Sequence, residues 1–196
     1  FVQGPNQAWP GKSYWAQWLV FGKDSVQCIF LDTWRFARPG EPDNNLLGEE
    51  QWNWLEQALA QPHKKLRLIF TAKSFFWEQN KGDSWHSFPP ARARFAALLE
   101  KAKGPLLLVS GSHPCAAVAL GDAGKRRVAE LQTNGLNQVR WRLGRTPEKA
   151  AIIGPYCQRN FGLLTISWNA PVSLKYQIID LSGFEVEQWT AYLGDL

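Results

Sequence analysis

Residues 26–110 alternate between apolar runs and amphipathic segments, and this alternation limits the folds that the chain can adopt. Apolar runs occupy 26–32 (VQCIFLD), 66–72 (LRLIFTA) and 106–110 (LLLVS). Runs of this length and composition are typical of strands that are covered on both faces. The segments between them have helical spacing, so the order is strand, helix, strand, helix, strand. That order predicts an α/β fold whose central sheet is largely parallel.

Both intervening segments carry signals for the start and the buried face of a helix. Glu49 and Glu50 fall in the first turn of one segment, where carboxylates complement the helix dipole. Pro89 and Pro90 suit the first turn of the other, because this turn leaves its amide hydrogens unpaired and proline has none. The predicted apolar faces consist of Trp52, Leu55 and Leu59 in the first helix and Phe95, Leu98 and Leu99 in the second.

The rest of the chain is richer in strands than in helices. An irregular lead-in over residues 1–16 precedes a hairpin formed by 17–21 and 26–32, whose turn is Gly-Lys-Asp-Ser. Five further strand-like segments occupy 116–120, 127–132, 161–168, 172–179 and 184–189. These segments are separated by turns and predict an antiparallel, β-rich second half. No linker divides residues 17–196, so we expect one structural unit there.

Composition excludes several classes of protein. The chain has 196 residues, of which 45% are hydrophobic and 13% aromatic, so it is not intrinsically disordered. It lacks the roughly 18–20 consecutive apolar residues that a membrane-spanning helix needs, and we expect a soluble, globular protein without a membrane span. Met is absent, even at position 1, which predicts a portion of a longer polypeptide. Cys28, Cys115 and Cys157 are too few for a disulfide framework, and their pairing is left open.

The net charge of +5 is concentrated in residues 125–149, which contain seven cations and two acids. One interpretation is a binding site for phosphate or nucleic acid. Its candidate anion-binding residues are Arg126, Arg127, Arg140 and Arg142. The other interpretation is a solvated loop or hairpin whose charges keep the edge soluble. The irregular spacing of the arginines is unlike that of a recognition helix and favours the second interpretation.

Two polar residues follow predicted central strands. Asp32 comes directly after VQCIFL, and His113 lies just beyond LLLVSG. Ligand and metal sites in open α/β sheets gather at the carboxyl ends of strands, so these two side chains are candidates for one site. An aspartate that accepts hydrogen bonds from the backbone of its own loop is an equally good interpretation of Asp32. The other histidines, His63 and His86, are too scattered to form a metal-binding motif.

Several strings of the sequence resemble, in the same order, segments of the PhoD-like alkaline phosphatases and phosphodiesterases of the metallophosphatase superfamily. These strings are LDTWRFARP followed by LLGEEQWNWLEQAL, then WHSFPPARARFAALL, LLLVSGSHP, LQTNGLNQ and NFGLLTISW. The similarity covers residues 17–190, and its most specific part is the pattern G-E-E-Q-W-x-W-L. The chain is therefore similar to the C-terminal half of that family.

The resemblance implies that residues 17–196 are the C-terminal half of a metallophosphatase-like domain. Such a domain is a four-layer α/β/β/α sandwich with a β-rich antiparallel C-terminal region. In that family a metal centre at the strand ends generates a hydroxide and neutralises the phosphoester transition state. An active relative would therefore hold a divalent metal (Ca, Fe, Mn or Zn) and act on a phosphate-containing small molecule. The resemblance also implies an extracytoplasmic location, periplasmic or secreted.

The sequence departs from the family where the metal ligands belong. Gly111 matches the glycine of S-G-D-x-H, but Ser112, His113 and Pro114 stand where that pattern has Asp, any residue and His. His113 is the one candidate metal ligand, and it would substitute only through a one-residue shift of register at Pro114. Trp34 stands where the family has the Arg of L-D-T-R. The chain has no counterpart of the family's N-terminal half, which carries further metal ligands.

Three functions remain open. The first is a catalytically degenerate relative that acts in binding or assembly. The second is a metal-dependent phosphomonoester or phosphodiester hydrolase whose N-terminal half lies elsewhere. The third is a polyanion-binding protein that uses residues 125–149, with nucleic acid not the expected ligand. Loss of the Asp and His of D-x-H favours the first, because each missing ligand lowers metal affinity. The expected partner is the missing N-terminal half or another protein chain, and no catalytic residue is assigned.

Overall fold

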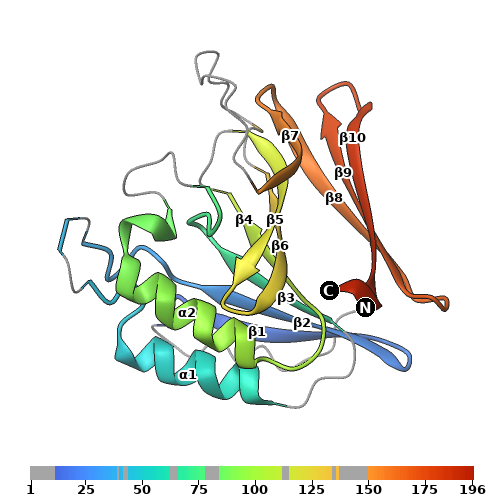
Figure 1. Cartoon of the computed structure of the whole chain (residues 1–196). Coiled ribbons are helices and arrows are strands. Elements are labelled where there is room, and N and C mark those ends of the chain that lie inside the picture. Colours follow the sequence, from blue (N-terminus) through green and yellow to red (C-terminus); the bar gives the residue numbers. More distant parts are fainter. Residues whose placement is uncertain are drawn as a thin grey trace.

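Two sheets and two α-helices are stacked in three layers in the computed structural model (Figure 1). The structure describes residues 12–38, 40–41, 44–61, 66–77, 84–111, 115–133, 136 and 150–196. A seven-stranded sheet forms the middle layer, with the helices on one face and a three-stranded sheet on the other. The mixed α/β class with an antiparallel C-terminal sheet is therefore confirmed. A fourth, helical layer is not seen among the described residues and stays a prediction.

The middle sheet contains β1 (Trp15–Phe21), β2 (Asp24–Leu31), β3 (Leu66–Thr71), β4 (Leu106–Ser110), β5 (Ala116–Ala123), β6 (Arg126–Gln132) and β7 (Ala151–Tyr156). The small sheet contains β8 (Asn160–Ser167), β9 (Ser173–Asp180) and β10 (Glu185–Tyr192). The helices are α1 (Glu49–Ala60) and α2 (Pro89–Lys101), with short 3₁₀ turns η1 (Trp85–Ser87) and η2 (Leu193–Asp195). No helix of the described part has both the length and the apolar character that crossing a membrane requires.

The middle sheet has the strand order β1-β2-β3-β4-β6-β5-β7. β2, β3, β4 and β6 are parallel, whereas β1, β5 and β7 are antiparallel to their neighbours. The pairing of β2, β3 and β4 confirms the predicted strand–helix–strand–helix–strand unit. β6 departs from the expected antiparallel second half, because the β5–β6 hairpin turns back and brings β6 beside β4. The carboxyl ends of four parallel strands therefore meet at one edge.

Strand boundaries mostly follow the predicted segments, with one omission. The β1–β2 hairpin is confirmed, and Gly22 adopts the positive φ of 63° that its tight turn requires. β1 starts at Trp15, two residues earlier than predicted. β7 was not predicted, because Gly154 and Pro155 interrupt its short apolar run.

Both predicted helices are confirmed, and their C-terminal ends are held by arginines from the sheet. Arg67 of β3 is fully buried and donates to the carbonyls of Gln61 and Lys103. Arg126 of β6 donates to the carbonyls of Ala102 and Gly104, just after α2. These carbonyls lack partners within the helices, and positive charge at this end complements the helix dipoles. Burial lowers the pKa of both guanidinium groups, and the nearby charge of Arg126 lowers that of Arg67 further.

The middle sheet is apolar on both faces, as the composition of its strands predicts. Ile29, Ile69 and Leu108 pack with the helices. The alternate residues Leu68 and Leu107 pack with Leu174, Tyr176 and Ile178 of the small sheet. Period-two alternation thus divides each strand between two separate cores.

Candidate functional site

The carboxyl-terminal edge of the parallel strands is where a ligand site is expected in a sheet of this kind. Four polar residues stand there, one at or just after the end of each parallel strand: Asp32, Thr71, Ser110 and Gln132. Asp32 is therefore at the predicted edge. His113 lies outside the described residues, as do Ser112 and Pro114.

The carboxylate of Asp32 accepts hydrogen bonds from its own loop. Its Oδ1 accepts the backbone N–H groups of Trp34 at 2.9 Å and Arg35 at 3.0 Å, and its Oδ2 accepts the hydroxyl of Ser13. Partial burial acts to raise the pKa of Asp32, but these hydrogen bonds outweigh it and the net pKa is lowered. The sequence left two interpretations of Asp32 open, and the structure shows the one in which its carboxylate accepts hydrogen bonds from its own loop. Its oxygens organise the loop that follows β2.

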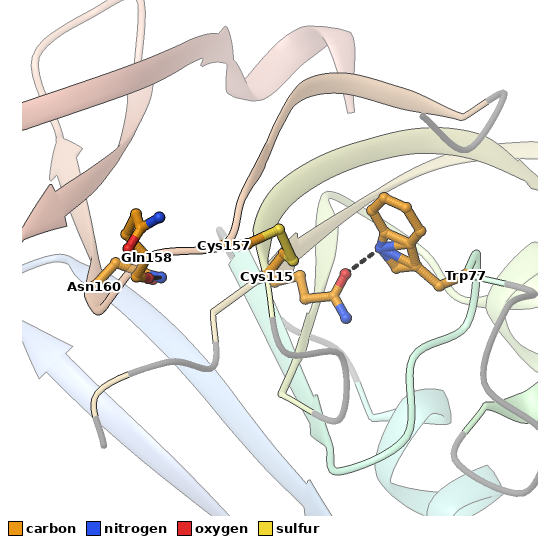
Figure 2. Close-up of a disulfide and its surroundings, with 6 residues drawn as sticks. Trp77, Cys115, Cys157, Gln158 and Asn160 are labelled. Carbon is orange, nitrogen blue, oxygen red and sulfur yellow. Dashed lines mark hydrogen bonds between the residues drawn. A yellow bond between two sulfur atoms is a disulfide. The ribbon is translucent and has the colours of Figure 1, made fainter. Parts of the chain in front are cut away.

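Two tryptophans fill the edge beside β3 and β6. The indole of Trp77 donates to the side-chain oxygen of Gln132, a contact drawn as the dashed line to Trp77 in Figure 2. The indole of Trp85 donates to the hydroxyl of Thr71 at 3.1 Å. Trp85 is also stacked on Phe95 of α2, with ring centroids 4.5 Å apart. Polar strand-end groups are thus bound to large aromatic side chains of the loop between β3 and α2.

A buried carboxylate anchors the same loop. Glu130 of β6 is fully buried and accepts the backbone N–H groups of Phe75 and Phe76, each at 2.8 Å. Burial raises the pKa of Glu130, although these hydrogen bonds and the positive charge of Arg92 act against it. Glu130 is not among the site residues that the sequence predicts. The available signal was the position of this acid among the apolar residues of RRVAELQ. A carboxyl group that is buried with such neighbours is rarely left without partners, so it predicts a hydrogen-bonded site.

An open apolar pocket of about 350 Å³ lies at the same edge. The residues that line it include Phe30, Phe70 and Val109 together with Thr71, Ser110 and Gly111. Phe30 and Phe70 are stacked with centroids 4.5 Å apart. The pocket is mainly hydrophobic and aromatic, which is the usual lining of a site for a small molecule or an apolar side chain.

A disulfide links the segment before β5 to the segment after β7. Cys115 and Cys157 are bonded, while Cys28 is a buried free thiol. Figure 2 shows the bond with Trp77 on one side and Gln158 and Asn160 on the other. The position of His113 in the sequence, between Gly111 and Cys115, puts it within a few residues of this link. The number of cysteines does not predict which of them form a disulfide. Cys115 and Cys157 come together because β5 and β7 are neighbouring strands in the folded sheet.

The structure describes two of the four predicted anion-binding arginines. Arg127 is exposed, whereas the guanidinium of Arg126 donates to carbonyl groups at the end of α2. Arg140 and Arg142 lie outside the described residues. Anion binding by this segment stays a prediction, and Arg127 is the one of the two described arginines that is open to solvent.

The described part of the edge does not fit a divalent metal. Across the described ranges, no three His, Cys, Asp or Glu side chains gather as a metal would need. Ca²⁺ and Mg²⁺ prefer several oxygen ligands, whereas zinc and iron also bind imidazole. The carboxylate of Asp32 is engaged by three donors, and Thr71 and Gln132 are bound to indoles. We therefore derive no metal chemistry from these residues.

The solved structures that resemble this arrangement include two that are similar to it at low sequence identity. One is described as "GAP50 the anchor in the inner membrane complex of Plasmodium": TM-score 0.65, 13% identity, 92% of this chain and 54% of that chain. The other is described as "Structure of PhoD": TM-score 0.59, 12% identity, 90% of this chain and 40% of that chain. No protein-family model and no curated protein sequence matches. The chain has a PhoD-like fold, and it spans about half or less of the length of these two structures.

Proposed function

We propose that this chain belongs to a PhoD-like metallophosphatase-type protein that acts in binding or assembly rather than in phosphoester hydrolysis. The observation that carries the proposal is how the strand-end groups are used. Thr71 and Gln132 bind the indoles of Trp85 and Trp77, and Asp32 binds Ser13 and its own loop. In a metal-dependent hydrolase, side chains at these positions are expected to hold metal or substrate.

Aromatic side chains also support this proposal. Trp77 and Trp85 are each 2% exposed or less, and they fill the edge with hydrophobic surface. A charged phosphoester and its metal ions would require this volume to be polar. One of the two similar structures is described as an anchor in a membrane complex, so a role in assembly has a precedent within this fold.

A metal-dependent hydrolase of phosphomonoesters or phosphodiesters is the second candidate. One supporting observation is the pocket of about 350 Å³ at the strand ends. Another is that His113 follows Gly111, which lines this pocket, by two positions in the sequence. In this case the N-terminal half of the domain supplies most ligands for Ca, Fe, Mn or Zn. His113 then contributes the single ligand from this chain, and the substrate is a small phosphate ester.

We infer an extracytoplasmic location, periplasmic or secreted. The disulfide between Cys115 and Cys157 supports it, because such bonds persist mainly in oxidising compartments. Labelling of free thiols in protein taken directly from its source tests this inference. A fully reduced Cys115 would contradict it.

Assays of the full-length protein separate the two functions. Purified protein is incubated with aryl phosphate monoesters and diesters, with Ca²⁺, Mn²⁺, Fe²⁺ or Zn²⁺ added separately. The binding proposal predicts no metal-dependent turnover. Turnover that requires a metal and is lost in His113→Ala, but retained in His86→Ala, would contradict the proposal and support the hydrolase.

A further inference from the structure

The β1–β2 hairpin exposes large apolar side chains at its tip. Val20 is 62% exposed and Phe21 is 52% exposed, directly before the turn at Gly22 and Lys23. Successive strand residues point to opposite faces of a sheet, so the tip is apolar on both faces. A protein layer that packs on one face of the sheet would cover only one of these two side chains. Their exposure therefore indicates a partner that surrounds the tip.

The turn between β8 and β9 lies beside this tip. Trp168 follows β8, and its ring centroid is 6.4 Å from that of Phe21 (Figure 1). Tyr192 is 51% exposed at the end of β10 and lies opposite Ser173 at the start of β9, so it belongs to the same edge. The two turns, residues 20–23 and 167–172, contain one charged residue, Lys23. These side chains form the apolar tip: Val20, Phe21, Trp168 and Tyr192.

Basic side chains lie at the same edge of the middle sheet. At this edge the parallel strands begin, α2 ends and β5 turns into β6. Arg126 joins the last two, since its guanidinium donates to the carbonyls of Ala102 and Gly104. The exposed cations here are Lys23, Lys101, Lys103, Lys125 and Arg127. The exposed acids beside them are Glu100, Asp122 and Asp195, so positive charge is in excess.

The loop after β2, at the opposite edge, also exposes two aromatic side chains, Trp34 and Phe36. Each of them already faces a cation. Lys73 Nζ lies 4.0 Å from the ring centroid of Trp34, and the guanidinium of Arg35 lies 5.6 Å from that of Phe36. The exposed acids of that edge, Glu41, Glu49 and Glu50, outnumber its exposed cations, Arg35 and Arg38. Charge therefore favours the edge with the apolar tip for an anionic partner.

We propose that this edge binds the surface of an anionic lipid bilayer. The apolar tip enters the boundary between headgroups and acyl chains, where apolar side chains leave water and the rings of Trp and Tyr are commonly found. Lys101, Lys103 and Lys125 contact lipid phosphates, and each basic residue near such a surface strengthens binding about fivefold. The membrane surface lies at the edge opposite the candidate site and goes beyond the proposed function.

Nucleic acid is the other polyanion that a basic edge attracts. Its phosphates would satisfy the lysines, but it offers no hydrocarbon for Val20. Sites for single strands combine aromatic rings with a basic groove that tracks the backbone. In this protein the apolar tip and the lysines occupy separate turns, and Lys23 is the one charge within the two turns of the tip. A bilayer offers both an anionic surface and an apolar interior, and this separation favours it.

Co-sedimentation of the full chain with lipid vesicles tests the proposal. Vesicles of phosphatidylcholine alone are compared with vesicles of phosphatidylcholine and phosphatidylglycerol in equal parts, and a DNA duplex is tested beside them. We expect binding to the anionic vesicles that is about tenfold or more tighter than to the neutral ones. An increase in salt from about 0.1 M to about 1 M shortens the Debye length from about 10 Å to about 3 Å and should weaken this binding.

One pair of variants tests the apolar tip. Phe21→Ser should weaken binding to the anionic vesicles about fivefold to tenfold, because less apolar surface leaves water. The control is Phe161→Ser. Phe161 is 43% exposed and lies at the end of β8 that is far from Trp168, so its replacement should leave vesicle binding unchanged.

A second pair of variants tests the charges. The double variant Lys103→Gln/Lys125→Gln should weaken binding to the anionic vesicles about tenfold or more. The control is Arg35→Gln/Arg38→Gln, which removes two exposed cations from the opposite edge and should leave binding unchanged. The urea midpoint of each variant shows that it still folds.

Four results would overturn the proposal. They are no binding to anionic vesicles, equal binding to both kinds of vesicle, equal losses in a variant and its control, and binding to the DNA duplex that is as tight as vesicle binding and unchanged in Phe21→Ser. The last result would assign the edge to nucleic acid. None of the four depends on catalysis, so metal-dependent turnover would contradict the proposed function without bearing on this edge.

Discussion

The carboxylate of Glu130 accepts the backbone N–H of Phe75 at 2.8 Å, which ties the loop after β3 to the middle of β6. The same loop carries Trp77, whose indole binds Gln132 two residues further along β6. One strand therefore holds an aromatic loop through a carboxyl group and through a side-chain amide. The position of the loop depends on both.

Replacement of Glu130 by Gln should change how stability depends on pH. Burial raises the pKa of Glu130 in the folded protein, so the folded state holds this proton to higher pH than the unfolded state does. The contribution of Glu130 to stability is therefore full below its ordinary pKa of about 4.3, and it is lost as pH rises through the raised value. The unfolding free energy, measured in urea, should therefore fall with rising pH over that range in the wild type relative to Glu130→Gln. Parallel pH curves would contradict this.

Replacement of Arg67 by Met should destabilise the protein strongly. The guanidinium of Arg67 is fully buried and binds Gln27, Gln61 and Lys103. Its removal leaves buried acceptors unpaired, and we expect a loss of about 2–4 kcal/mol in unfolding free energy. The control is Arg127→Met at an exposed position, for which a change of about 0.5 kcal/mol or less is expected. Equal effects of the two substitutions would show that the contacts of Arg67 contribute little.

Reduction of the disulfide should lower stability. Cys115 and Cys157 are separated by 42 residues, and the chain-entropy model gives a stabilisation of about 4 kcal/mol for a loop of this size. Dithiothreitol should lower the urea midpoint of the wild type and of Cys28→Ala. It should have no effect on the double variant Cys115→Ser/Cys157→Ser. A wild-type midpoint that is insensitive to the reductant would contradict the prediction.

The Cys28 thiol should be unreactive in the folded protein. It is buried, and burial raises its pKa to about 11, so little thiolate is present at pH 8. Iodoacetamide should modify Cys28 only after denaturation, and mass spectrometry of peptides measures the extent. Rapid modification under native conditions would show that the space between the sheets opens.

Phe95 should be a main contributor to the core under the helices. Its ring is fully buried and is stacked on Trp85 at 4.5 Å, so Phe95→Ala should cost about 3–5 kcal/mol of unfolding free energy. Phe184 is 72% exposed, and Phe184→Ala is the matched control with little expected effect. If the two variants unfold at the same urea concentration, the packing of Phe95 does not contribute measurably to the stability of α2 on the middle sheet.

Local patterns predicted the elements between residues 26 and 110, because a strand with two apolar faces and a helix with one have distinct spacings. Trp52, Leu55 and Leu59 are buried on α1 as that spacing requires. The place of β6 between β4 and β5 was not predictable in this way. It depends on which strand of a hairpin turns toward the sheet, and this is decided by contacts between residues distant in the sequence.

The candidate site was predicted in location more than in chemistry. Asp32 stands at the expected strand end, but its oxygens accept bonds from Ser13 and from its own loop. The partners of Thr71 and Gln132 are tryptophans that lie many residues away in the sequence. No motif relates these residues, since the loop after β3 brings them together only in the folded chain. His113, Arg140 and Arg142 lie outside the described residues and stay predictions.

The bond between Cys115 and Cys157 turns β5, β6 and β7 into a closed covalent ring. A protease that cuts any single peptide bond within this ring opens a loop without releasing a fragment. Both pieces would migrate as one molecule until a reductant separates them. A single cut between Cys115 and Cys157 therefore changes how the chain is connected but does not change the mass of the disulfide-linked molecule by loss of a fragment.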